Sequence, residues 1–171
     1  MTDKTLDNWK YYLREEHNKP KYKGAGCIIF CPDKDCMLLI RRSEGSFNGE
    51  LASTGGGVEG EETPFQTAIR ETIEEVGKDL SGHEPLNEHE DITEDGIHLT
   101  FLMGSIDEFP CSLNSEHDAW GWIDIDEVKM AINRKSGRLI SNNFFDREGK
   151  KIEVDAKIHS NTIDALKEFN L

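Results

Sequence analysis

Residues 56–78 read GGVEGEETPFQTAIRETIEEVGK, a glycine-rich segment that runs directly into one well-marked helix. Thr63 is a good N-cap residue, Pro64 suits the first helical position because no partner awaits its missing N–H, and Gln66 completes a Thr-x-x-Gln capping box. Gly77 suits the left-handed residue that ends many helices. These signals predict a helix between Thr63 and Gly77.

Acidic residues gather on one side of this helix. At 100° per residue the apolar side carries Phe65, Ala68, Ile69, Thr72, Ile73 and Val76. The carboxylates of Glu71, Glu74 and Glu75 are expected to face away from the core. Like charges so close repel unless a cation lies among them, and Mg²⁺ prefers carboxylate and phosphate oxygens. The spacing predicts a Mg²⁺–phosphate site, with a solvated acidic face as the alternative.

The preceding segment, residues 43–62, is polar and rich in glycine. It is too long for a simple connector, so we expect a functional loop. The glycines at 55–57 would let the backbone approach an ion or a phosphate without an intervening Cβ. Glu62 could form a charge-assisted hydrogen bond with Arg70 and so hold the loop against the helix.

Together these residues resemble the signature of the Nudix hydrolases, the MutT-like family. The pattern is Gly56, five residues, Glu62, seven residues, and then RETIEEVG from Arg70 to Gly77. Every glycine and charged position of the signature is filled between residues 56 and 78.

The sequence departs from the family pattern at three positions. Thr72 and Lys78 stand where a large aliphatic residue is usual, and Thr54 stands where the family often has the proline of a Pro-Gly-Gly. The Thr72 hydroxyl is expected to bond a carbonyl one turn back, and Lys78 is expected to point to solvent. None of the three departures removes a carboxylate, so we expect catalysis to survive them.

The resemblance extends along the chain. A strand that ends in Arg41 and Arg42 precedes the glycine loop, and residues 116–128 are similar to the family's acidic loop, tryptophan strand and following helix. Family-like sequence thus spans about 23–132, within a single domain over 1–171 whose terminal segments have no assignment. The resemblance implies an α/β fold: a Nudix-like α/β/α sandwich with a mixed central sheet and a catalytic loop–helix motif.

The family hydrolyses a nucleoside diphosphate linked to another group X, with water attacking a phosphorus atom. A diphosphate repels hydroxide, so this chemistry needs a metal ion; Mg²⁺ is the expected cofactor, and Mn²⁺ a substitute for it. The resemblance implies metal ligands from Glu74 and Glu75, from the carbonyl of Gly55 or Gly56, and from Glu71 and Glu116.

The resemblance to the family also implies the catalytic roles. Glu71 would be either a ligand or the base that deprotonates water, and Arg70 would orient the carboxylates with Glu62 as its partner. Glu116 would be a base or an additional ligand, with a plain loop charge as the alternative. His117, beside it, is a weaker candidate.

Substrate choice lies outside the signature. Arg41 or Arg42 would contact a phosphate, and only one of them is expected to face the site from an alternating strand. Trp120 or Phe47 could stack on a base, whereas Trp122 is expected in the core. A nucleoside triphosphate, including oxidised ones, is the favoured substrate. ADP-ribose and nucleotide sugars are alternatives, and a module that only binds a nucleotide or a protein is an alternative of another class.

The composition limits the partners. The 171 residues carry 34 acidic and 20 basic side chains, a formal charge of −14, which argues against a nucleic-acid track or an anionic membrane. The apolar stretches at 27–31 and 37–40 are far short of the ~20 residues that span a bilayer, and the first residues lack a signal-peptide core. We expect a cytoplasmic protein whose partner is a small nucleotide, with a homodimer as an open alternative.

Weaker signals fill the rest of the chain. A hairpin is expected from strands at 24–31 and 36–41. Further predictions are a short helix at 6–16, an acidic loop at 83–95, strands at 97–106 and 120–123, a helix through 128–132 capped by Asp124 or Asp126, a hairpin over 143–154, and a helix at 162–169 capped by Ser160 or Asn161. The four cysteines are expected to be reduced thiols, with a zinc site as the alternative.

Overall fold

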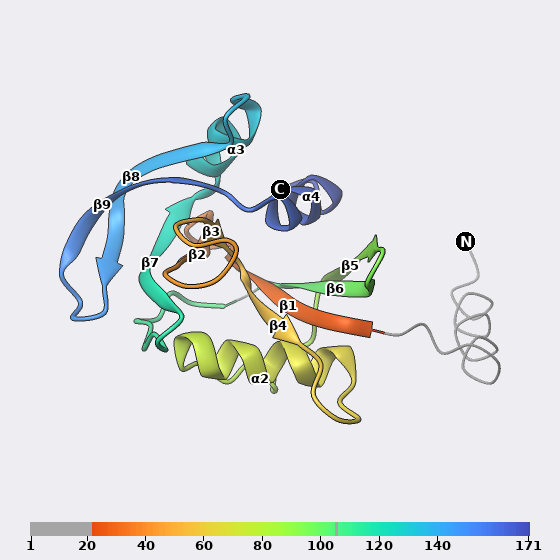
Figure 1. The fold of residues 1–171 in the computed structure, drawn as a ribbon. Coiled ribbons are helices and arrows are strands. Elements are labelled where there is room, and N and C mark those ends of the chain that lie inside the picture. The colour runs from red at the N-terminus through yellow and green to blue at the C-terminus, as the bar shows by residue number, and fades with distance from the viewer. Residues whose placement is uncertain (1–21, 105) are drawn as a thin grey trace.

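The computed structural model describes residues 22–104 and 106–171, which form a mixed sheet with helices on both faces (Figure 1). The helix predicted for residues 6–16 lies outside the described residues. The described strands are β1 (Tyr22–Cys31), β2 (Cys36–Arg42), β3 (Leu51–Ala52), β4 (Thr54–Gly57), β5 (Asn87–Thr93), β6 (Gly96–Met103), β7 (His117–Asp124), β8 (Arg138–Asp146) and β9 (Lys151–Lys157). The described helices are α2 (Pro64–Val76), α3 (Ile125–Asn133) and α4 (Ser160–Glu168).

The strands follow the order β5-β6-β1-β2-β7-β8-β9, while β3 pairs with β2 and β4 pairs with β1. The pairing of β1 with β6 is parallel, and the other pairings between these strands are antiparallel. The sheet is therefore mixed, as predicted. The expected hairpin is also confirmed, because Phe30 pairs with Met37 and Cys31 pairs with Cys36.

Strand β1 is buried on both faces, which explains its unbroken apolar run. Cys27 and Ile29 pack in the cluster that includes the apolar residues of α2, whereas Ile28 packs in the cluster that includes those of α3 and α4. Figure 1 shows α2 on one side of the sheet and α3 and α4 on the other. Each fully buried isoleucine contributes about 1.5–3 kcal/mol. This layering is the α/β/α sandwich predicted from the sequence.

Helix α2 has the ends that its sequence predicts. The Thr63 Oγ1 accepts the Gln66 backbone N–H at 3.2 Å, and the Gln66 Oε1 accepts the Thr63 backbone N–H at 2.9 Å. Gly77 closes the helix with a φ of 76°, in the left-handed region. Both ends of α2 are thus set by capping interactions between residues that are close in the sequence.

Two segments predicted as loops contain strands. Residues 43–62 carry β3 and β4, and residues 83–95 carry β5, whose side chains are mostly exposed. Strand β5 lies at the edge of the sheet, where charged residues are common. The edge strand therefore lacks the apolar alternation by which a strand is recognised.

The remaining predicted elements are confirmed with shifted ends. Asp124 is the N-cap of α3, and strands β8 and β9 form the late hairpin. The predicted cap of α4 is wrong: His159 takes that position instead of Ser160 or Asn161. None of the described helices has the length and apolar character needed to cross a membrane.

The segment after β9 packs back on the strand that leads into the glycines. Ile158 forms a parallel bridge with Leu51, and the His159 N–H donates to the Leu51 carbonyl at 2.8 Å. The Ser53 N–H donates to the Thr162 Oγ1 at 3.2 Å. These contacts explain why α4 begins only after residue 159, and they place its first turn beside the glycine strand.

Candidate active site

Strand β4 brings the glycine backbone onto the carboxylates of α2. The Gly55 N–H donates to Glu75 Oε2 at 2.9 Å. A Cβ at position 56 would displace the Glu71 carboxylate, which lies directly against Gly56. The close backbone approach expected from the glycine run is therefore present, and it is directed at two of the predicted metal ligands.

Arg70 ties the glycine loop to the helix. Its Nε and Nη2 donate to the two oxygens of Glu62 at 2.8 and 3.2 Å, which is the pairing predicted from the sequence. Its Nη1 donates to Glu71 Oε1 at 2.7 Å and to Glu74 Oε2 at 3.2 Å, and its Nη2 also donates to the Gly57 carbonyl at 2.7 Å. The Arg70 hydrogen bonds are the main cause that lowers the pKa of Glu62 to about 2. All five N–H groups of the guanidinium are used.

Two of the three departures from the family pattern contact each other. The Thr54 and Thr72 hydroxyl oxygens are 2.8 Å apart, and both side chains are buried. The Thr72 hydroxyl donates to the Ala68 carbonyl at 2.8 Å, as predicted, and the Thr54 hydroxyl is 3.3 Å from the Cys27 carbonyl. The pair thus joins β1, β4 and α2 beneath the site.

Glu75 is buried, and its predicted orientation away from the core is wrong. Its side chain is 4% exposed, whereas Ile73, predicted for the core, is 43% exposed. Burial is the largest cause that raises the pKa of Glu75 to about 8; the Gly55 N–H opposes it, and the charges of Glu71 and Glu116 add to it. The carboxylate side of the helix is covered by other parts of the chain, which helix periodicity alone does not reveal.

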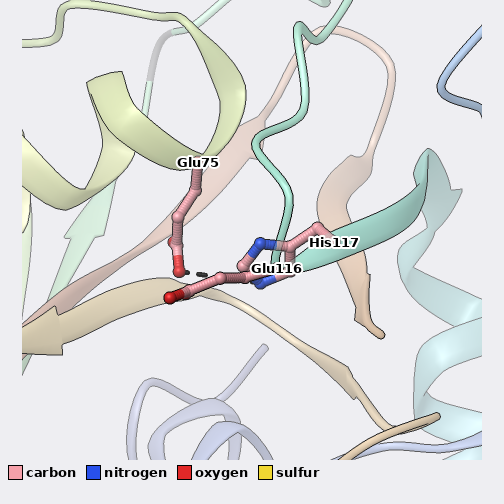
Figure 2. A group of neighbouring side chains, drawn as sticks. All are labelled: Glu75, Glu116 and His117. Carbon is pink, nitrogen blue, oxygen red and sulfur yellow. Dashed lines mark ion pairs between the residues drawn. The ribbon is translucent and has the colours of Figure 1, made fainter. Parts of the chain in front are cut away.

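Glu116 joins this carboxylate from the loop before β7, and His117 lies beside it (Figure 2). One ligand atom from each of Glu75, Glu116 and His117 lies within 4.8 Å of the others, the one such group of three among the residues that the structure describes. The Asn114 Oδ1 accepts the Glu116 backbone N–H at 3.1 Å and lies 2.9 Å from His117 Nδ1. The Nδ1 therefore carries the proton, and Nε2 turns its lone pair toward Glu75 Oε1, 3.6 Å away.

His117 is neutral in this setting. Burial is the largest cause that lowers its pKa to about 4, and the charge of Arg42 acts in the same direction. The sequence ranks His117 below Glu116, and the structure brings both to the carboxylate group. The signal that could have identified it is its place directly after Glu116, because a turn held by Asn114 carries both side chains.

The two arginines at the end of β2 diverge. The Arg41 Nε donates to Asp118 Oδ1 at 2.7 Å. Arg42 instead lines a cavity of about 320 Å³, and its Nε is buried without a hydrogen-bond partner. The pairing of β2 with β7 shifts register between these two residues, and such bulges often re-aim side chains near functional sites. Of the two arginines, Arg42 lines this cavity and Arg41 does not.

This cavity adjoins the glycine strand and the start of α4. Its walls include residues 55–57, Arg42, Phe47, His98 and His159. The Phe47 ring, predicted as a stacking candidate, is 44% exposed and stands edge-on to the His159 ring with 4.3 Å between centroids. The cavity combines backbone glycines, a guanidinium and aromatic rings, which are groups that can contact a phosphorylated, ring-containing ligand.

Trp120 and Trp122 lie apart from this cavity. Trp120 is buried and stacks on Phe145 with 4.9 Å between centroids, and Trp122 packs against the core with its Nε1 donating to the Phe109 carbonyl at 2.9 Å. Both tryptophans line a second cavity of about 510 Å³ that shares no lining residue with the first. Lys78 does not simply point to solvent, because its Nζ lies 5.3 Å from the Phe109 ring centroid.

His159 is a site residue that the sequence does not indicate. It precedes two residues, Ser160 and Asn161, that are better N-caps, so local rules assign it no role. Its place in the cavity depends on the pairing of residue 158 with Leu51. A contact between segments so distant in the chain leaves no local pattern.

Comparison with known proteins bears on the fold and the family. The family model described as NUDIX domain matches residues 20–146. The comparison with curated proteins found no significant match.

Among solved structures, a MutT/nudix family protein from Enterococcus faecalis has a TM-score of 0.58 and 19% identity, with 98% of this chain and 70% of that chain covered. A Caenorhabditis elegans Ap4A hydrolase has a TM-score of 0.53 and 23% identity, over 61% of this chain and 81% of that one. The Escherichia coli dihydroneopterin triphosphate pyrophosphohydrolase has a TM-score of 0.50 and 24% identity, over 67% and 89%. At these identities the likeness concerns the fold.

Proposed function

Because the chain belongs to the NUDIX family, whose hydrolases act on pyrophosphate bonds, we propose that it is a metal-dependent pyrophosphohydrolase of nucleoside triphosphates, including oxidised ones. The observation that carries this proposal is Glu75, a buried carboxylate whose pKa is raised further by the charges of Glu71 and Glu116. Such a cluster is costly in the ionised form unless a cation compensates it. All-oxygen ligation suits Mg²⁺, and Mn²⁺ accepts the same ligands.

The proposed ligand set is the one that the family resemblance implies, and the closeness of Glu75 and Glu116 supports it. We assign metal ligation to Glu71, Glu74, Glu75, Glu116 and the carbonyl of Gly55 or Gly56. A bound divalent ion supplies charge neutralisation of the phosphate oxygens and a lower pKa for a bound water.

Arg70 and Glu62 position this set. The Arg70 guanidinium bonds Glu71 and Glu74 directly, and its paired bonds to Glu62 fix the plane of the guanidinium. Without this network, the glutamate side chains would lose rotamer freedom only when the metal binds, at a cost in free energy. The network therefore lowers the entropic cost of assembling the ligands.

Glu116 is the better of the two candidate bases. Burial raises the pKa of Glu71 and the Arg70 hydrogen bond opposes it, but that bond, at 2.7 Å, keeps one of the two Glu71 oxygens engaged with the protein. Within the described residues, no hydrogen bond engages the Glu116 carboxylate, and it lies beside Glu75. We assign proton abstraction from the attacking water to Glu116 and a ligand role to Glu71.

The cavity beside β4 supports a substrate with one nucleoside. Its volume of about 320 Å³ is at the small end of the ~300–1,000 Å³ of ligand pockets. Arg42 is the arginine that faces it, so we assign substrate phosphate binding to Arg42 rather than to Arg41. The formal charge of −14 agrees with a small nucleotide substrate and opposes a nucleic-acid track; the proposed compartment is the cytoplasm.

A substrate panel tests the proposal. Nucleoside triphosphates, 8-oxidised nucleoside triphosphates, ADP-ribose, nucleotide sugars and dinucleoside polyphosphates are incubated with Mg²⁺, with Mn²⁺ and with EDTA, and ³¹P NMR identifies the products. We expect a nucleoside monophosphate and pyrophosphate from a triphosphate, and no turnover in EDTA. Faster turnover of ADP-ribose or a nucleotide sugar would make that compound, rather than a nucleoside triphosphate, the assigned substrate. Binding without turnover across the whole panel would favour a module that only binds its ligand.

A further inference from the structure

His159 presents a hydrogen-bond donor whose direction is fixed by the start of α4. Its Nδ1 accepts the Asn161 backbone N–H at 3.2 Å. In a neutral imidazole with Nδ1 as acceptor, the proton is on Nε2. Burial is the largest cause that lowers the pKa of His159, so the neutral form prevails near pH 7. His159 is therefore a donor without charge.

That donor has no partner in the protein. The His159 Nε2 and the Arg42 Nε are the two buried side-chain nitrogen or oxygen atoms without a hydrogen-bond partner in the described part of the chain. Buried donors are nearly always satisfied, and an exception requires an explanation. The residues that carry both exceptions line the same small cavity, which points to a ligand there as the missing partner.

Both donor residues line the cavity that the glycine strand also lines. His159 and Arg42 line the same cavity as residues 55–57, and the charge of Arg42 acts on both His159 and Glu75. Arg42 thus lies between the helix cap and the carboxylate group. A guanidinium and a neutral N–H together favour an acceptor with negative charge, because the positive charge of the guanidinium is attracted more strongly to an anionic oxygen than to a neutral carbonyl.

We propose that Arg42 Nε–H and His159 Nε2–H together hold an anionic phosphate oxygen of the substrate. This inference rests on the proposed function and adds a positioning residue, His159, outside the family signature. The choice of histidine as the N-cap of α4 is consistent with it, because serine or asparagine would cap the helix but neither side chain extends as far as the His159 Nε2 position.

The decisive variant is His159→Asn. Asparagine is among the best N-cap residues, so its Oδ1 replaces Nδ1 as the cap acceptor, while its Nδ2–H donors end one bond short of the Nε2 position and the donor at that position is lost. We expect KM to rise about tenfold, as for loss of one hydrogen bond to a charged group, with kcat and the melting temperature nearly unchanged. His83→Asn, at an exposed histidine, is the matched control and leaves KM unchanged. An unchanged KM in a folded His159→Asn protein would overturn the inference and leave the proposed function standing.

A metal-free measurement separates the inference from the hydrolase assignment. In EDTA, isothermal titration of the wild-type chain with inorganic pyrophosphate is expected to show binding that weakens about tenfold in His159→Asn. Binding that depends on His159 in a protein that hydrolyses nothing would reject the proposed function and keep the inference. No binding by the wild type, or a His159→Asn defect confined to nucleosides without phosphate, would assign the donors to another group and overturn it.

Discussion

Arg70 and Arg42 stand on two sides of the same site and differ in how their hydrogen bonds are used. Arg70 has a protein acceptor for each of its five N–H groups, whereas the Nε of Arg42 is buried without one. A saturated guanidinium holds other side chains in place. A guanidinium with an unused N–H group can donate that hydrogen bond to a ligand. The candidate site therefore has two sides: a proposed metal side, built from α2 and β4, whose arginine has all its hydrogen bonds within the protein, and a cavity side, built from Arg42 and the start of α4, where we propose that a ligand supplies the missing partner.

The strongest test of the metal side is Glu75→Gln. The amide keeps the shape of the side chain and can still accept the Gly55 N–H, but it removes the negative charge. We expect kcat to fall roughly 10²–10³-fold, because a metal ligand supplies several kcal/mol of charge stabilisation. Steady-state assays with the preferred substrate measure the loss. Wild-type turnover in a folded Glu75→Gln protein would show that this carboxylate is not a ligand.

Arg70→Lys should have a smaller effect. Lysine keeps the charge but loses the planar fork that holds Glu62 and Glu71 together. Loss of a group that orients metal ligands typically lowers affinity or activity about 10–100-fold, so we expect a loss in that range, together with a higher apparent dissociation constant for Mg²⁺. Arg138→Lys, in an exposed ion pair with Asp155, is the control and should change neither value. Equal effects of the two substitutions would show that Arg70 does not orient the carboxylates.

The metal side should also make the metal-free protein sensitive to pH. The pKa of Glu75 is raised to about 8 in the folded chain from a usual value of 4.5, so between these values the folded state binds more protons than the unfolded state. Stability then falls as pH rises. In EDTA the wild type should lose melting temperature from pH 5 to pH 8 relative to Glu75→Gln, by about 2–4 °C for each kcal/mol. Parallel pH profiles for the two proteins would contradict the raised pKa.

The smallest effect is expected beneath the metal side, at Thr54 and Thr72. Each hydroxyl keeps another acceptor when its partner is replaced, the Ala68 carbonyl for Thr72 and the Cys27 carbonyl for Thr54. Thr54→Val and Thr72→Val should therefore each cost about 0.5–1.5 kcal/mol in the free energy of unfolding. The double variant should cost less than the sum, as a denaturant-based mutant cycle would show. Strict additivity would mean that the 2.8 Å contact is not coupled.

The metal side was largely predictable, and the particular residues show why. The ends of α2 at Thr63 and Gly77 depend on groups within four residues, and the pairing of Glu62 with Arg70 spans only two helical turns and a loop. The burial of Glu75 was predicted wrongly, because it depends on β4 and on the segment that carries Glu116. The periodicity of a helix indicates which residues share a face. It does not indicate which of those faces other segments of the chain will bury.

The cavity side was mostly beyond prediction. Strand alternation leaves Arg41 and Arg42 as candidates, and Arg42 is the one that lines the cavity. His159 enters the site through backbone pairing with residue 51, and strand β5 forms at an edge where its charged side chains cost little. Contacts of this kind are decided by topology, and a single sequence records topology only weakly.

The bonds from Leu51 and Ser53 to Ile158, His159 and Thr162 have a consequence for synthesis. A nascent chain that has emerged from the ribosome as far as residue 146 already contains every carboxylate of the proposed metal site, the glycine run and the whole family match. It still lacks the segment that pins the strand leading into Gly55 and the histidine that completes the cavity. Translation of residues 158–162 is therefore the step at which a chain with the right ligands becomes one with a closed site, and ribosome-stalled intermediates of increasing length offer a direct way to observe that moment.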